Sequence, residues 1–224
     1  MEDIGYGVRL IYSDNHYAVV DKPAGVLSQG DETGDVSVVD VVAAWRKRDK
    51  GKPGAAWVGL VHRLDRPVRG LLIVALTSKA AERLSEQVRD RQLIKVYRAM
   101  VVGRPKAERL EGIVDGKAAA LTVTPVGRAG LDAPSGRPWW RVGVELETGR
   151  KHQIRIQLAD AGHPIVGDVR YGGPPWHDPR AIALEAAQLW FLHPTRHELV
   201  EYSLPDAPAW WATPAREPSS SRRP

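Results

Sequence analysis

Short segments in which apolar and polar residues alternate constrain the fold of this sequence more than any other feature. In the clearest, residues 140–146, every second side chain is apolar, whereas Arg141 and Glu145 between them are charged. The same pattern predicts a strand pair within residues 9–27 that turns at Asp14-Asn15. It also predicts strands over residues 71–76, 93–102 and 121–126. These segments indicate hairpin-like strand pairs.

Three other segments have the three-to-four residue period of a helix. The first spans residues 37–48. The second begins at its cap, Thr77-Ser78, and places Ala80, Leu84 and Val88 on its inner face. The third follows Thr148 and ends near Gly162, with Ile154, Leu158 and Ala161 inside. Because hairpin-like pairs outnumber convincing strand–helix–strand units, we predict the α+β class rather than a doubly wound parallel sheet.

The composition bounds the class of protein. The 224 residues suffice for one large domain, and they contain no cysteine, which excludes disulfides, thiolate nucleophiles and cysteine-ligated metals. No apolar run approaches the roughly 20 residues that span a bilayer, and the acidic start Met1-Glu2-Asp3 is unlike a signal peptide. We therefore expect a cytoplasmic protein with no membrane partner. The net charge of +5 suits a polyanionic partner without identifying one.

The sequence predicts neither a metal site nor a bound cofactor. Among the seven histidines only His193 and His197 have ligand-like spacing, and Pro194 between them argues against a shared helical face. Glycine-rich phosphate loops, dinucleotide-binding fingerprints and serine nucleophile elbows do not occur in the sequence.

Asp65 stands among three arginines, Arg63, Arg66 and Arg69, on a segment that a proline and a glycine should bend into a loop. A surface ion network would explain this pattern and would contribute little stability. The alternative is an aspartate nucleophile whose ionised form is stabilised by the nearby positive charges.

Residues 148–155 hold a second cationic group. On a helix, Lys151, His152 and Arg155 would share one face, and the amide groups of the first turn would add affinity for anions. A solvated basic face explains the same residues. Lys95 and Tyr97, two apart on one face of a predicted strand, are a weaker candidate site, because tyrosines in strands usually pack in the core.

Taken in order, these residues resemble the motifs of the RluA-type pseudouridine synthases, over residues 10 to 204 approximately. The matching segments are Asp21-Lys22-Pro23-Ala24-Gly25-Val26, His62-Arg63-Leu64-Asp65, Lys95-Val96-Tyr97-Arg98-Ala99, the segment 148–155, and Gly162-His163-Pro164-Ile165-Val166-Gly167-Asp168. The resemblance implies a mixed, mainly antiparallel, curved sheet flanked by helices and loops. Because residues 1–9 leave no room for the accessory S4 domain, the chain resembles the members that consist of the catalytic domain alone.

The resemblance implies that the chain isomerises uridine to pseudouridine in ribosomal or transfer RNA, as a monomer and without metal or cofactor. Asp65 matches the catalytic aspartate, Tyr97 the tyrosine that stacks on the target base, and Arg155 the basic residue that pairs with the aspartate. Arg63 matches the arginine that fills the gap left by the flipped nucleotide. The other candidate RNA-binding residues are His62, Lys95, Arg66, Arg69, Arg150, Lys151 and His152.

Two positions depart from the family pattern. Members often have Thr-Ser-Gly where this sequence has Val68-Arg69-Gly70, and Leu-His-Ala where it has Leu184-Glu185-Ala186. Because the proposed catalytic side chains are intact, we interpret both changes as affecting specificity or packing. Two alternative functions are a catalytically silent RNA-binding or RNA-folding factor on the same scaffold, and an unrelated hydrolase that uses Asp65.

The expected catalytic domain spans residues 1–212. The remaining residues, 213–224, are rich in proline, serine and arginine and are expected to form a disordered tail. Arg222 and Arg223 in this tail could contact RNA or simply be part of the disordered segment.

Overall fold

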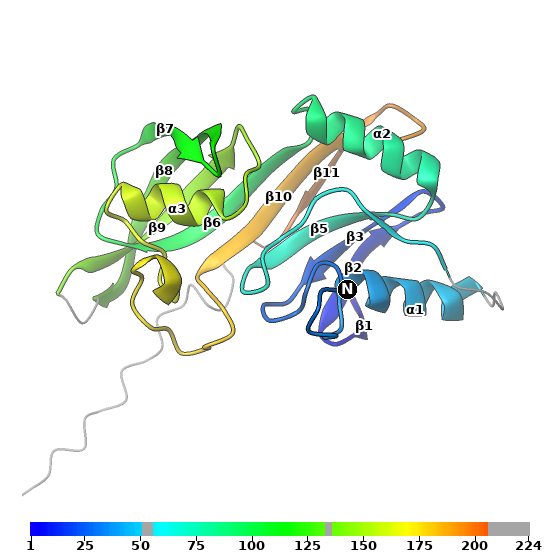
Figure 1. Cartoon of the computed structure of the whole chain (residues 1–224), viewed down its shortest axis with the longest axis horizontal. Coiled ribbons are helices and arrows are strands. Elements are labelled where there is room, and N and C mark those ends of the chain that lie inside the picture. Colours follow the sequence, from blue (N-terminus) through cyan, green and yellow to red (C-terminus); the bar gives the residue numbers. More distant parts are fainter. Residues whose placement is uncertain (51–55, 133–135, 206–224) are drawn as a thin grey trace, which may run out of the picture.

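The computed structural model describes residues 1–50, 56–132 and 136–205. Within these residues eleven strands form one sheet, accompanied by three α-helices and one short 3-10 helix (Figure 1). The helices are α1 (Val38–Lys50), α2 (Ser78–Arg89), α3 (Gln153–Asp160) and the 3-10 helix η1 (Val169–Tyr171). The strands are β1 (Glu2–Gly5), β2 (Val8–Ser13), β3 (Tyr17–Lys22), β4 (Gly59–Leu60), β5 (Arg69–Ala75), β6 (Ile94–Val102), β7 (Glu108–Val114), β8 (Lys117–Asp132), β9 (Pro138–Leu146), β10 (Leu184–Leu192) and β11 (Leu199–Ser203).

The sheet is mainly antiparallel, which confirms the predicted α+β class. Its strand order is β1-β2-β3-β5-β10-β6-β9-β8-β7, with β4 paired to β5 and β11 paired to β10. The β5–β10 pair is parallel, and the other pairs are antiparallel. The strand pair predicted within residues 9–27 is β2–β3, joined at Asp14.

The helices cover both faces of the sheet, as each buries its apolar stripe against a different set of strand residues. Helices α1 and α3 contribute to one buried cluster, which contains Val42 of α1 and Leu158 of α3. Helix α2 packs on the opposite face, where Ala80 and Leu84 join a second cluster built around Phe191. Thr77 caps α2 as predicted, since its side chain accepts a hydrogen bond from the Ala80 amide.

The structure corrects two predictions made from periodicity. The strand expected over 121–126 is part of the much longer β8, and it pairs with β7, which the sequence pattern did not predict. The third helix begins at Gln153 rather than after Thr148. The His152 backbone has the left-handed conformation with φ 56°, so the helix cannot extend further toward the N-terminus. Ala161, expected inside, is exposed.

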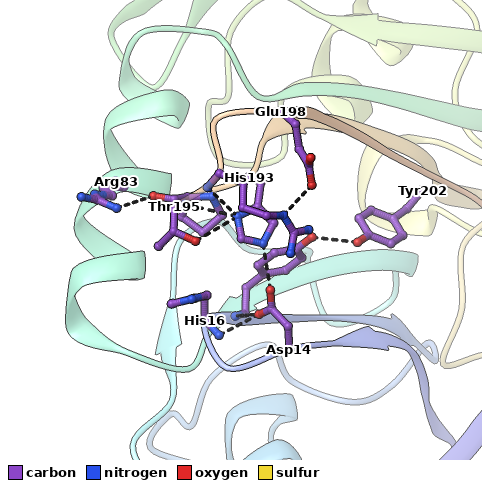
Figure 2. Close-up of polar contacts among 10 residues, drawn as sticks. Asp14, His16, Arg83, His193, Thr195, Glu198 and Tyr202 are labelled. Carbon is purple, nitrogen blue, oxygen red and sulfur yellow. Dashed lines mark hydrogen bonds and ion pairs between the residues drawn. The ribbon is translucent and has the colours of Figure 1, made fainter.

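A buried polar cluster around His193 joins the β2–β3 turn to the β10–β11 turn (Figure 2). The fully buried His193 ring accepts the Thr195 and Arg196 amides at Nδ1, so its Nε2 carries the proton and donates to the Asp14 carboxylate at 2.8 Å. The His193 ring is therefore used for hydrogen bonds within the protein. The backbone turn from His193 to His197 accounts for the spacing that could otherwise suggest a pair of metal ligands.

None of the described helices is long and apolar enough to cross a membrane. In the same described ranges, no group of three or more histidine or carboxylate side chains is placed to hold a metal ion. The boundary at residue 212 and the tail 213–224 with Arg222 and Arg223 lie outside the described residues.

Candidate active site

A cleft of about 900 Å³ opens between the loop that carries Asp65 and the turn that joins β9 to α3. The start of β6 and the end of α2 complete its wall. It gathers eight of the predicted site residues, from segments far apart in the sequence: His62, Arg63, Asp65, Lys95, Tyr97, Arg150, Lys151 and His152.

Asp65 reaches the cleft because the residues around it are anchored in the core. Leu64 is 5% exposed, and its amide and carbonyl groups both bond to the Ser28 hydroxyl. Val68 is also buried, and its amide donates to the Asp65 carbonyl, closing the turn. The two apolar anchors fix the backbone on either side and leave the Asp65 carboxylate 20% exposed at the cleft.

Arg155, in the first turn of α3, pairs with two carboxylates. Its Nη1 lies 3.2 Å from Asp65 Oδ2, while its Nε and Nη2 donate to the two oxygens of Asp168 at 2.6 and 2.8 Å. Arg155 and Asp168 are both almost fully buried. Burial disfavours the guanidinium charge, but the Asp168 and Asp65 carboxylates outweigh it and raise the pKa of Arg155. The predicted pairing of Arg155 with Asp65 is therefore present in the structure.

His152 provides a second contact to Asp65. Its Nε2 lies 3.5 Å from Asp65 Oδ2, and its Nδ1 lies 2.8 Å from the Tyr171 hydroxyl. Because His152 precedes α3, it does not share a helical face with Arg155 and Lys151 as expected; the three residues are brought together by the turn instead. The Gln153 side chain holds that turn, accepting from the Arg150 amide and donating to the Ala120 carbonyl.

Tyr97, Lys95 and His62 line the cleft, and burial shifts the pKa of each. Burial and the nearby Asp65 charge raise the pKa of Tyr97, so its hydroxyl stays protonated. Burial lowers the pKa of Lys95. Burial, followed by the Lys95 charge, lowers the pKa of His62 to about 3, and its Nε2 accepts the Ile73 amide at 3.2 Å.

Two predicted site residues lie away from the cleft. Arg66 bonds to the Gly25 carbonyl at 3.0 Å and pairs with Asp35 at 2.7 Å. Arg69 lines a separate pocket of about 490 Å³, and the parallel β5–β10 register places it opposite Glu185. The two departures from the family pattern, Arg69 and Glu185, are thus neighbours in the sheet. This supports the interpretation that both changes affect packing.

Three residues of the site had no role assigned from the sequence: Lys22, Asp168 and Tyr171. Lys22 and Asp168 lie within matched motifs, so the motif order could have indicated them. Lys22 is fully buried, and its ammonium donates to the carbonyls of Pro23, Val26 and Arg66. The last of these carbonyls belongs to the residue directly after Asp65, so Lys22 ties the loop that carries Asp65 to the end of β3.

Replacing Lys22 with methionine should remove the part of the unfolding free energy that depends on the titration of Lys22. Burial lowers the pKa of Lys22 from 10.5 to about 7, despite the Asp65 charge, which opposes that shift. Between these two values the unfolded chain holds a proton that the folded chain has lost, so this residue's contribution to stability rises with pH. Relative to Lys22→Met, the parent's unfolding free energy should rise by up to about 1.4 kcal/mol per pH unit.

Urea unfolding at several values between about pH 7.5 and 9.5 measures this difference. Lys79→Met, at an exposed lysine on α2, is the matched control. Parallel pH profiles for the parent and Lys22→Met would contradict the assignment.

Comparison with known proteins is consistent with this site. Residues 16–160 match the RNA pseudouridylate synthase family, and this range includes Asp65, Tyr97 and Arg155. A Synechocystis protein described as an uncharacterized RNA pseudouridine synthase is 32% identical over 85% of this chain and 63% of its own length. A Vibrio vulnificus ribosomal large subunit pseudouridine synthase D is 31% identical over 88% of this chain and 66% of its own length. This chain thus spans slightly less than two thirds of either relative.

Solved structures agree in fold. Human RNA pseudouridylate synthase domain containing 4 superposes with a TM-score of 0.72 at 22% identity, covering 91% of this chain and 90% of the human one. Human RNA pseudouridylate synthase domain containing 1 gives a TM-score of 0.66 at 24% identity, covering 92% and 86%. With the RluA-type motifs in order and their key side chains meeting in one cleft, the chain belongs to the RNA pseudouridylate synthase family.

Proposed function

We propose that this protein is an RNA pseudouridine synthase in which Asp65 is the catalytic group. The observation that carries the proposal is the Asp65 carboxylate, which lies 3.2 Å from the buried Arg155 guanidinium in the cleft that Tyr97 also lines. A silent binding factor would not need a carboxylate in a site for phosphates, because it would repel the ligand.

The reaction breaks the N1–C1′ bond of a uridine, rotates the uracil and joins its C5 to C1′. Asp65 must be ionised whether it attacks C1′, attacks C6 or assists loss of the uracil. Arg155 stabilises that ionised form, and Asp168 holds Arg155 in place from behind. A partly desolvated carboxylate that is held in a fixed position is a stronger electrostatic partner for a developing sugar cation than one in water.

The target nucleotide must leave the RNA stack to reach Asp65, at a cost of a few kcal/mol. Stacking of the base on Tyr97 would recover about 1–3 kcal/mol. We propose that Arg63, which is exposed and lines the cleft, fills the gap that the flipped nucleotide leaves in the RNA.

The remaining contacts with RNA are electrostatic. Six lysine and arginine side chains line the cleft and would hold phosphates: Arg63, Arg89, Arg91, Lys95, Arg150 and Lys151. Such contacts give affinity that falls with salt and carry little sequence information. We propose a uridine in ribosomal or transfer RNA as the substrate, and the name of the Vibrio relative supports ribosomal RNA.

Transcripts that carry tritium at uridine C5 test the proposal, because joining C5 to C1′ expels that hydrogen into water. The purified protein is incubated with labelled ribosomal RNA, labelled transfer RNA or labelled large ribosomal subunits. We expect tritium release from one of these pools. RNA binding without release from any of them would overturn the proposal in favour of a silent RNA-binding factor.

A further inference from the structure

A surface outside the cleft combines an exposed tryptophan with positive charge. Trp57 is 48% exposed, more than any other described tryptophan. A single exposed apolar side chain is ordinary on a protein surface, so its exposure alone implies no function. What distinguishes Trp57 is the way its neighbours hold it, the charge beside it and its position on the segment that leads into the cleft.

Two contacts fix Trp57 in place. The end of its six-membered ring packs against Gly59, where a Cβ atom would lie 2.5 Å from Cη2 of the indole. The Trp57 carbonyl accepts a hydrogen bond from Nη1 of Arg46 at 3.1 Å, and the same guanidinium donates to the Leu76 carbonyl. Arg46 therefore ties the Trp57 backbone to α1 and to the residue that follows β5. A ring that is already fixed loses less conformational freedom when it binds a ligand.

The last turns of α1 give this surface its positive charge. Residues 46–49 hold three cationic side chains and one carboxylate: Arg46, Lys47, Arg48 and Asp49. Lys47 and Arg48 are exposed. Cations attract the phosphates of a nucleic acid strand, while an exposed aromatic ring offers a surface on which a base can stack. Proteins bind single strands through this combination.

One extended segment joins Trp57 to the cleft (Figure 1). Its first part is β4, which pairs with β5, and residues 61–63 after β4 line the cleft. At a rise of about 3.3 Å per residue, the backbone from Trp57 to Arg63 spans at most about 20 Å. A single strand of about six stacked nucleotides covers the same distance.

We propose that Trp57 is a second RNA contact of this protein, and that its indole stacks on an unpaired base within about six nucleotides of the target uridine. This inference rests on the proposed synthase activity, which brings RNA into the cleft. A strand that leaves the cleft past Arg63 follows the segment toward α1, where Lys47 and Arg48 attract its phosphates. The stack adds affinity without reading sequence, because every base has an aromatic face.

Trp57→Ala measured with RNA of two lengths tests this contact. The probes are fragments of the RNA that the parent converts, centred on the modified uridine, with about ten or about two nucleotides on each side. Filter binding of the longer fragment should weaken about 5- to 150-fold, the range that one stacked base contributes. The shorter fragment ends before it reaches Trp57, so its affinity should stay within about twofold of the parent's.

Salt dependence separates stacking from a loss of charge contacts. Because the indole is uncharged, Trp57→Ala should leave the slope of log affinity against log salt concentration as it is in the parent. Trp57→Phe keeps an aromatic ring and should hold the longer fragment within about threefold of the parent's affinity. The matched control is Tyr6→Ala, at an exposed aromatic residue between β1 and β2, which should change the affinity for neither fragment.

Equal losses on the long and the short fragment would assign Trp57 to the fold, and no loss on either would remove it from the RNA path. Both results overturn the proposal. The synthase proposal fails separately, because it depends on tritium release. If the parent releases no tritium, oligouridylates of about twelve and about four nucleotides replace the two fragments, and the same difference between long and short RNA is expected.

Discussion

Asp65→Asn is expected to abolish tritium release, by at least about 10³-fold, while RNA binds as tightly as before or more tightly. The amide cannot supply the negative charge that the reaction needs, whichever route the reaction takes. Binding should hold or improve because the substitution removes one negative charge from a cleft lined by cations. Arg155 retains its bidentate pair with Asp168, so the fold should be preserved.

Single-turnover tritium release and filter-binding affinities measured on the same preparations check this prediction. Asp178→Asn is the matched control, because Asp178 lines the separate pocket beside Arg69 rather than the cleft. Turnover by Asp65→Asn at a rate near the parent's would remove Asp65 from the mechanism. A large loss of RNA affinity would assign it a binding role.

Periodicity predicted those parts of the sheet where one face is buried and the other is not. In β9, Val142 and Val144 are fully or almost fully buried while Glu145 is exposed, so the alternation is visible in the sequence. Strand β7 was missed because almost all its residues are exposed, which erases that pattern. A signal was available in Asp115-Gly116, where both residues have positive φ, as a two-residue hairpin turn requires.

The motifs predicted which residues form the candidate site better than periodicity predicted how they are held. Asp65 pairs with Arg155 and shares the cleft with Tyr97, but Arg66 and Arg69 leave the cleft because the chain turns at Val68 and enters the sheet. Proximity in sequence does not reveal that reversal. Nor does it reveal that Arg69 faces Glu185, since the parallel β5–β10 pair forms only when the complete sheet assembles.

Asp168→Asn should lower the unfolding free energy by about 3–5 kcal/mol, the usual cost of removing one partner from a buried ion pair. Asp168 is 1% exposed and Arg155 6% exposed, so water cannot replace the lost charge. The substitution would leave the guanidinium with Asp65 as its one carboxylate partner among the described residues, through a single 3.2 Å contact. Catalysis should also fall, because Arg155 is no longer fixed behind Asp65.

Stability and catalysis can be separated by replacing both partners of the pair. Arg155→Met with Asp168→Leu removes both buried charges, and such apolar replacements are often neutral or stabilising. Urea unfolding should therefore show that the double variant regains most of the stability lost in Asp168→Asn. Tritium release should stay low, because Asp65 then lacks its cationic partner.

The exposed pair Asp178–Arg180 provides the reference for these measurements, since its arginine side chain is 77% exposed. Asp178→Asn should cost less than about 1 kcal/mol. If Asp168→Asn cost no more than this surface substitution, the pair would not hold Arg155 in place. If the stable double variant recovered activity, Asp65 would not depend on Arg155. The combination of a stable fold and lost turnover is the result that assigns the Arg155–Asp168 pair to catalysis rather than to folding alone.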